Sequence, residues 1–216
     1  MRKIEKGSLV VLEQWTRSNK GKKYADLTDR EDIKDAIRHT CVREQHGLCA
    51  YCCRRITLEK TSAHNEHIEA QSLAPNRTLD FQNIVASCNQ PGQCGKAHGH
   101  QLLRLTPLMV ECEAELQFEL SGLVGGKTER AQDCIKVFTL GGDQAANRGL
   151  IGERKVMINT LLYPHGMDAS GLSLEGDDLL DLLHDELLLV DESQQLQAFS
   201  PALINVIRRL KALQVS

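Results

Sequence analysis

The sequence has no apolar run long enough to cross a membrane, because runs such as Leu187–Val190 fall far short of the roughly 20 residues that a spanning helix needs. The N-terminal stretch MRKIEKGSLVVLEQW lacks the sustained apolar core of a secretory signal. Internal repeats and low-complexity tracts are also missing. Hydrophobic residues make up 41% and charged residues 25%, which excludes a disordered or collagen-like chain. We therefore expect a globular cytoplasmic protein with no membrane association.

Positive charge is scarce in the second half of the chain. Residues 1–108 contain 17 Lys and Arg against 12 Asp and Glu, whereas residues 109–216 contain 9 against 17. Lys and Arg are absent from 156–207, where nine Asp and Glu occur. A basic half beside an acidic half indicates that one face meets a polyanion and the other a different partner.

Cysteine and histidine, in contrast, are abundant, with eight residues of each. In a reducing compartment cysteines are metal ligands or buried packing residues more often than disulfides. Cys49 and Cys52 form a CxxC turn, whose two thiolates can reach the same zinc ion, and Cys88 and Cys94 form a second pair. The spacing predicts one structural zinc site of these four cysteines. Cys53 is a possible substitute for Cys52, and a thioredoxin-like redox role is disfavoured because no βαβ pattern surrounds the turn.

The first segment, residues 1–46, combines a basic stretch with a helix. Arg17, Lys20, Lys22 and Lys23 form either a mobile solvated loop or an arm that contacts phosphates. The run 28–31, Thr-Asp-Arg-Glu, has the spacing of a capping box and predicts that a helix begins there.

The last segment, residues 106–216, is predicted to hold a strand pair and a helical region. Alternating residues predict strands over 108–113 and 116–120, and helical periodicity predicts helices over 128–140, 150–163 and 201–213. Residues 177–192 predict an acidic helix with more leucine than one core stripe needs, which is either a cap on the domain or a docking surface. Three further cysteines fall on the apolar side of their segments and are expected to be packing residues: Cys41, Cys112 and Cys134.

Between the two cysteine pairs lie Glu66-His67-Ile68 and, further on, Asp80-Phe81-Gln82-Asn83. The arrangement CxxC…EHI…DxxN…C…C resembles the HNH endonucleases, in their zinc-containing ββα-metal form. Within that superfamily the segments MRKIEKG, CAYC, LDFQN and CGKAHG resemble the HNH effectors (PtuB) of Septu and retron-associated anti-phage systems. The motif resemblance covers residues 49–100, and a weaker likeness extends over most of the chain.

The resemblance implies a role for each motif residue. His67, with an unperturbed pKa of about 6.5, suits the general base that activates water. The carbonyl of Asn83 would accept the other ring N–H of His67. Glu66 would point away from His67 on a regular strand, and a bulge or turn at the strand end would let it bind a catalytic Mg²⁺ or Mn²⁺.

The third HNH residue, a further ligand of the catalytic metal, is harder to locate because the second cysteine pair is spaced C-x5-C. His98 is the first choice, His100 the second and Asn89 a distant third. His64 is expected to be a bystander. Arg54, Arg55, Lys60, Arg77 and Lys96 surround this block, either as phosphate contacts or as ordinary surface charges.

Taken together, these features predict an α+β fold with a small zinc-stapled HNH core at 47–105 inside a largely helical envelope. The expected function is a metal-dependent endonuclease, the effector of an anti-phage defence system. Its substrate would be DNA, or tRNA as the second choice, and its partner an ABC/SMC-type ATPase (PtuA-like) docked on the acidic helix. The alternative is a catalytically silent, zinc-stabilised module that binds nucleic acid or protein. The Glu66-His67 pair and Asn83 favour the nuclease, since a pure zinc knuckle needs neither.

Overall fold

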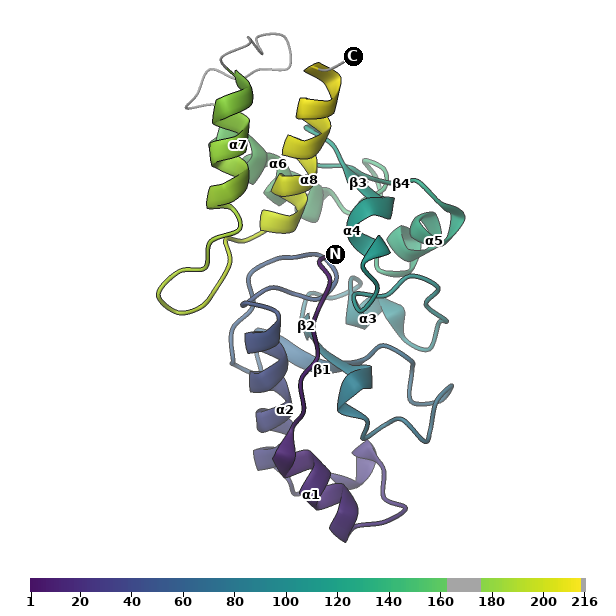
Figure 1. Ribbon diagram of the computed structural model, residues 1–216. Coiled ribbons are helices and arrows are strands. Elements are labelled where there is room, and N and C mark those ends of the chain that lie inside the picture. The colour runs from purple at the N-terminus through teal and green to yellow at the C-terminus, as the bar shows by residue number, and fades with distance from the viewer. Residues whose placement is uncertain (163–175, 215–216) are drawn as a thin grey trace.

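The computed structural model describes residues 1–162 and 176–214, and its fold is mixed α+β (Figure 1). This confirms the predicted class. The helices in the described residues, apart from short 3-10 turns, are α1 Val10–Ser18, α2 Glu31–Glu44, α3 Gly95–His98, α4 Glu111–Glu115, α5 Glu129–Val137, α6 Arg148–Leu162, α7 Gly176–Glu186 and α8 Ser200–Gln214. The strands form two small antiparallel pairs: β1 Ala63–His67 with β2 Ile84–Cys88, and β3 Leu116–Phe118 with β4 Val124–Gly126.

The pair β1–β2 carries the residues singled out in the sequence. Ala63 lies opposite Cys88 and His67 opposite Ile84, so the ladder runs without a bulge to the end of β1. Every residue of β2 is buried. Helix α2 packs on this pair through a stripe at helical intervals that includes Ile33, Ile37 and Cys41. The strand pair thus has no bulge at Glu66, and of the two expected alternatives the chain shows a bend at the strand end, at residues 68–69.

Helix α2 begins later than the capping box predicts. Its N-cap is Arg30, which makes no side-chain cap hydrogen bond, and the Thr28 hydroxyl instead donates to the Ala25 carbonyl. Because Thr28 belongs to the turn that follows residues 24–26, its hydroxyl is used before the helix starts. Glu31 and Asp32 lie in the first turn of α2, where their negative charges stabilise the helix by interacting with the positive end of its dipole.

The strand predicted over 108–113 is wrong, because this stretch forms a turn and α4. The segment Glu111–Glu115 consists mainly of Glu and Ala, which are good helix formers, and it buries Cys112. Strand β3 pairs instead with β4, where a Cβ at Gly126 would lie 2.6 Å from the backbone nitrogen of Gln132. A glycine is thus needed for α5 to approach the strand.

One continuous apolar core runs through the described chain, from Met1 to Leu210. The chain's late segment returns to its middle: the backbone N–H of Leu196 donates to the His46 carbonyl at 3.1 Å, and that of Phe199 to the Cys53 carbonyl at 2.8 Å. In Figure 1, α1, α2 and β1–β2 occupy the lower half and α6, α7 and α8 the upper half. Within the described residues, no helix is both long and apolar enough to cross a bilayer.

Candidate metal centre and the adjoining histidine cluster

Four cysteines meet in one buried cluster. Cys49 and Cys52 come from the turn before β1, Cys88 ends β2, and Cys94 is the N-cap of α3. Their sulfur atoms all lie within 4.8 Å of one another, and Cys52 Sγ is 3.9 Å from Cys88 Sγ. Four thiolates around a tetrahedral zinc, each at ~2.3 Å, would be about 3.8 Å apart. The cluster therefore fits a structural metal such as zinc, as the spacing predicted.

Neighbouring groups support the sulfurs with hydrogen-bond donors. The backbone N–H of Cys88 donates to Cys49 Sγ at 3.3 Å, and the amide of Gln93 lies 3.7 Å from Cys88 Sγ and 3.8 Å from Cys94 Sγ. Donors of this kind disperse thiolate charge around a bound metal. Burial, followed by the neighbouring thiols, raises the pKa of Cys94 well above its ordinary value. A divalent cation is the natural way to hold several thiolates in so small a buried space.

Cys53, the possible substitute, does not belong to this cluster. Its backbone is in the left-handed region, with φ at 61°, and its side chain packs with Leu48 and Leu196. The other three cysteines are buried as predicted, and burial raises the pKa of each thiol to about 12. Such thiols are packing groups and not ligands.

A second polar cluster surrounds Glu66, immediately beside the cysteines. The alternation of β1 places His64 and Glu66 on one face of the strand, with Asn65 and His67 on the other. His98, from the end of α3, is fully buried, and its Nδ1 lies 2.7 Å from Glu66 Oε1. His64 Nε2 lies 3.4 Å from Glu66 Oε2. His64 is thus no bystander, whereas His100 is exposed beyond the end of α3.

The electrostatics of Glu66 follow from these two imidazoles. Burial by itself raises the pKa of the carboxyl group. Hydrogen bonds and charge from His64 and His98 outweigh burial, so that the pKa of Glu66 falls below its ordinary value. The carboxylate is therefore ionised at neutral pH.

His67 occupies a separate, buried position at the end of β1. Its Nε2 lies 2.9 Å from the carbonyl oxygen of Thr78, which can only accept, so Nε2 carries the ring proton. The amide of Gln71 donates to the remaining nitrogen, Nδ1, at 3.4 Å. Tyr24 packs edge-on against the ring at 4.9 Å between centroids. Burial lowers the pKa of His67, which leaves the ring neutral and Nδ1 basic near pH 7.

Asn83 does not accept from His67, which corrects the expectation drawn from the resemblance. Its Oδ1 accepts from the backbone N–H of Glu69 at 2.8 Å, and its Nδ2 donates to the Glu69 carbonyl at 3.0 Å and to the Arg77 carbonyl at 3.4 Å. Asn83 therefore clamps the loop that joins β1 to β2. That loop includes Thr78, so the effect of Asn83 on His67 is indirect.

The predicted basic groups are largely paired with acids. Arg54 forms a two-pronged ion pair with Glu153, Lys60 pairs with Glu31, and Arg77 with Asp80 and Glu69. Arg55 donates to Gln195 and Leu196, while Lys96 is exposed on α3. The exposed residues Lys22 and Lys23 line an open pocket together with the loop residues Pro75, Asn76, Thr78, Leu79 and Asp80. The basic arm and the loop that carries Thr78 thus share one surface.

Sequence reasoning missed two groups here. Gly95, the first residue of α3, is close enough that an added Cβ would lie 2.7 Å from both Glu66 Oε2 and His64 Nε2. Its position directly after Cys94 is a signal that the sequence does contain. Tyr24, held by Asn65 Nδ2 at 2.9 Å from its hydroxyl, reaches His67 from a distant segment, and no local spacing predicts that contact.

No protein-family model matches this chain, and no curated protein matches it.

Proposed function

We propose that the chain is a metal-dependent endonuclease of the HNH kind that hydrolyses phosphodiester bonds. The observation that carries the proposal is the arrangement on β1, β2 and α3. A buried, neutral histidine with a fixed tautomer ends β1, directly before the chain bends at residues 68–69, and its neighbour on the other strand face is a carboxylate that contacts a second buried histidine. Both lie on elements anchored by the four-cysteine cluster. A zinc-supported binding surface has no need of such groups.

His67 is the general base in this proposal. Nδ1 takes a proton from water, and the resulting hydroxide attacks phosphorus as the bond to the leaving oxygen breaks. Nε2–H stays on the Thr78 carbonyl, which holds the ring in the correct tautomer and orientation. The leaving oxygen is protonated from solvent. The contact from Gln71 is long at 3.4 Å and comes from an exposed side chain, so water can replace it.

Glu66 and His98 are the residues that would hold the catalytic Mg²⁺ or Mn²⁺. A divalent cation at this position would stabilise the negative charge that builds up on the phosphate oxygens. The ionised state of Glu66 at neutral pH fits this role. The burial of His98, which is 0% exposed, fits a ligand held in one orientation.

The proposed substrate is nucleic acid, with DNA preferred over a structured RNA such as tRNA. The arm with Lys22 and Lys23 shares a surface with the loop that holds the base, and it would track the phosphate backbone. Backbone contacts of this kind carry no sequence information, so the choice between the two polymers needs measurement.

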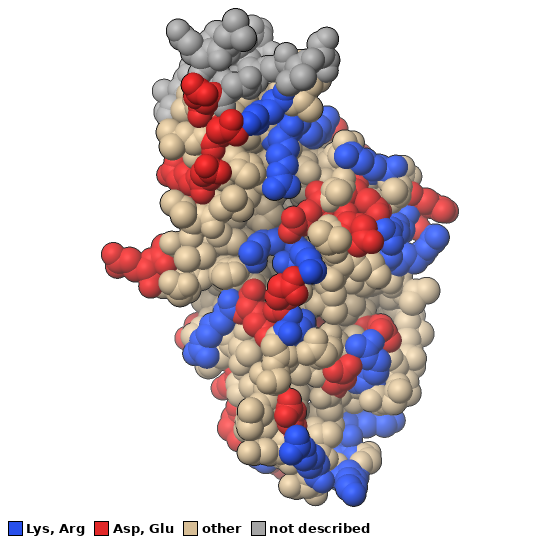
Figure 2. Space-filling view, in the orientation of Figure 1, with Lys and Arg blue, Asp and Glu red and all other residues tan. Residues whose placement is uncertain are grey.

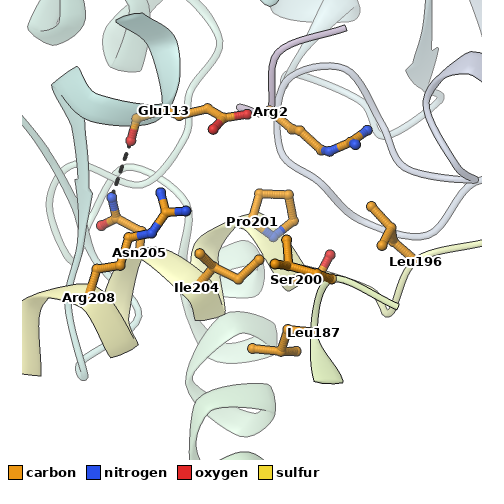
Figure 3. Close-up of a pocket in the computed structure, with 10 residues that line it drawn as sticks. Arg2, Glu113, Leu187, Leu196, Ser200, Pro201, Ile204, Asn205 and Arg208 are labelled. Atoms are coloured by element: carbon orange, nitrogen blue, oxygen red, sulfur yellow. Dashed lines mark hydrogen bonds between the residues drawn. The ribbon is translucent and has the colours of Figure 1, made fainter. Parts of the chain in front are cut away.

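The resemblance further supports a role as the effector of an anti-phage system with an ABC/SMC-type ATPase partner. Helix α7 is the proposed contact surface. Leu180, Leu183 and Leu187 of the predicted acidic stretch are buried, while Leu182 and Leu189 are 64% and 69% exposed. The pocket beside it is lined by Leu187, Leu188, Leu196, Ser200, Pro201 and Ile204, and by the polar residues Arg2, Glu113, Asn205 and Arg208 (Figure 3).

The competing function is a silent module that uses the zinc cluster to present a binding surface, a possibility that the four-cysteine site on its own supports equally well. The nuclease requires His67 as its general base, whereas the binding module does not require it. Purified, zinc-loaded protein should cleave plasmid DNA or tRNA when Mg²⁺ or Mn²⁺ is added. His67→Ala should lower cleavage by about 10²–10⁴-fold while zinc content and nucleic-acid binding stay unchanged. Equal cleavage by the variant, or none by either protein, would favour the binding module.

A further inference from the structure

His64 is oriented by a hydrogen bond that fixes which of its nitrogens carries the proton. Its Nδ1 lies 2.9 Å from Asn89 Oδ1. The orientation of the Asn89 amide is itself determined, because its Nδ2 donates to the Lys60 carbonyl at 2.6 Å. The oxygen facing His64 can only accept, so Nδ1 is the donor. In the neutral ring, Nε2 then presents a lone pair to Glu66 Oε2 at 3.4 Å.

His98 repeats this arrangement with its nitrogens exchanged. Its Nε2 lies 2.8 Å from the carbonyl oxygen of Gln101, which can only accept and therefore takes the ring proton. Nδ1 of the neutral ring then presents its lone pair to Glu66 Oε1 at 2.7 Å. Two nitrogen lone pairs thus face the two oxygens of one carboxylate. Acceptors that face each other this closely repel unless a proton, as in the hydrogen bonds that stabilise the Glu66 carboxylate, or a metal cation lies between them.

We propose that His64 is a third ligand of the divalent cation that Glu66 and His98 would hold, and that Asn89 and the Gln101 carbonyl orient the two rings for it. The inference rests on the proposed function for the roles of Glu66 and His98. Histidines that bind metals characteristically donate their other N–H to a carbonyl or carboxylate oxygen. Two ligands at right angles around an ion, each at about 2.1 Å, are about 3 Å apart. The distances from His64 Nε2 to Glu66 Oε2, 3.4 Å, and from His98 Nδ1 to Glu66 Oε1, 2.7 Å, lie on either side of that value, so each ring and its own carboxylate oxygen have the spacing of two neighbouring ligands.

The first residue of α3 keeps this space open. A Cβ at Gly95 would lie 2.7 Å from His64 Nε2 and the same distance from Glu66 Oε2. The Gly95 backbone N–H donates to Ser87 Oγ at 3.0 Å, which fixes the glycine over the strand pair. Since Gly95 follows Cys94, the zinc cluster and the histidine cluster are positioned by the same turn. This link explains why His64, which the proposed hydrolysis does not otherwise use, lies against the carboxylate.

The test is a Mn²⁺ titration of the zinc-loaded protein, with free Mn²⁺ followed by electron paramagnetic resonance. The unmodified chain should bind one Mn²⁺. His64→Ala should weaken this binding at least tenfold, and Asn89→Leu should weaken it by releasing the ring. His100→Ala is the matched control, because His100 is exposed near the same helix end and should leave binding unchanged. Unchanged zinc content reports that each variant is folded.

The outcomes separate this inference from the proposed function. If His64→Ala binds Mn²⁺ as tightly as the unmodified chain while Glu66→Gln does not, His64 is no ligand and the nuclease proposal stands. If the unmodified chain binds no Mn²⁺, the inference is overturned. If binding depends on His64 but no nucleic acid is cleaved, the cation site stands and the proposed function fails.

Discussion

At the scale of single residues, the chemical state of His67 depends on neighbours that are distant in sequence. The Thr78 carbonyl sets its tautomer, and Tyr24 covers one side of the ring. The sequence did identify His67 and Glu66 as a pair, since they are adjacent and lie between two cysteine pairs. It could not identify Thr78 as the acceptor, because the loop that brings Thr78 back is shaped by Asn83 and has no periodic pattern.

Asn83→Ala should therefore act on the loop and only indirectly on the base. The substitution removes hydrogen bonds to the backbone of Glu69 and Arg77 at a buried position. We expect the free energy of unfolding to fall by about 1 to 3 kcal/mol. Cleavage should fall by roughly ten- to a hundredfold through misplacement of His67. Chemical denaturation and a cleavage assay measure the two effects, and a complete loss of cleavage with full stability would contradict the indirect role.

Gly95→Ala tests the close approach of α3 to β1. Alanine is the better helix former, so substitution at the start of α3 carries no helix penalty. The added methyl group would instead meet the tips of Glu66 and His64, which can move. We expect zinc content to be unchanged and thermal stability nearly so, while Mn²⁺ binding and cleavage decrease. Normal Mn²⁺ affinity in the variant would show that the space over Gly95 is not needed.

At the scale of elements, local spacing predicted individual turns and helices, but it did not predict which segments pair as strands. The CxxC turn, α2 and the region of α5 follow from short spacings, and in the structure the Thr128 hydroxyl caps α5 by accepting from the Ala131 N–H. The strand expected over 108–113 failed because its few apolar residues fit a helical turn as well as a strand. Which segment pairs with β3 depends on Gly126 and the packing of α5, and both are tertiary effects.

The two cysteine-bearing turns should depend on zinc for their structure. Apparent binding energies of structural zinc sites, about 10–16 kcal/mol, are comparable with the whole stability of a domain. Cys49→Ser and Cys94→Ser should therefore lose zinc and thermal stability together. Cys41→Ser, at an equally buried position outside the cluster, should keep its zinc and lose far less stability. Metal analysis and thermal melts decide, and undiminished zinc in Cys49→Ser protein would exclude this site.

At the scale of the whole molecule, acidic and basic side chains are interspersed over the face shown in Figure 2, and the acidic stretch of the sequence has basic neighbours. Acidic side chains gather over α7, and Lys and Arg side chains of α8 lie beside them (Figure 2). Asp181 is paired with Lys211 of α8, so part of the acidic surface serves the packing of these two helices. Asp178 and Asp185 are exposed, and Asp185 Oδ1 lies 3.2 Å from Nδ1 of its neighbour His184. The side chain of Asp177 lies outside the described residues.

Charge reversal at Asp178 and Asp185 should weaken the proposed ATPase contact without unfolding the chain. Both side chains are exposed, so we expect stability to change by less than about 0.5 kcal/mol. Co-purification with the partner should become weaker and more sensitive to salt, because complementary charge on the rim is lost. Reversal of Asp181 makes an informative comparison, since it should also disturb the ion pair with Lys211. Normal co-purification of the Asp178 and Asp185 variant would reject α7 as the contact.

The two cysteine-bearing turns also form backbone hydrogen bonds with the first and the last residue of the segment that runs from Phe138 to Phe199. The Cys94 N–H donates to the Phe138 carbonyl at 2.9 Å, and the Phe199 N–H donates to the Cys53 carbonyl at 2.8 Å. Chelation of the zinc should release both anchors, so that a protease gains access to peptide bonds inside this stretch. Arg154, which is 1% exposed in the folded chain, is the sensitive reporter. Trypsin should cleave after Arg154 only once zinc has been withdrawn, and protein that is reloaded with zinc before trypsin is added should resist this cleavage again.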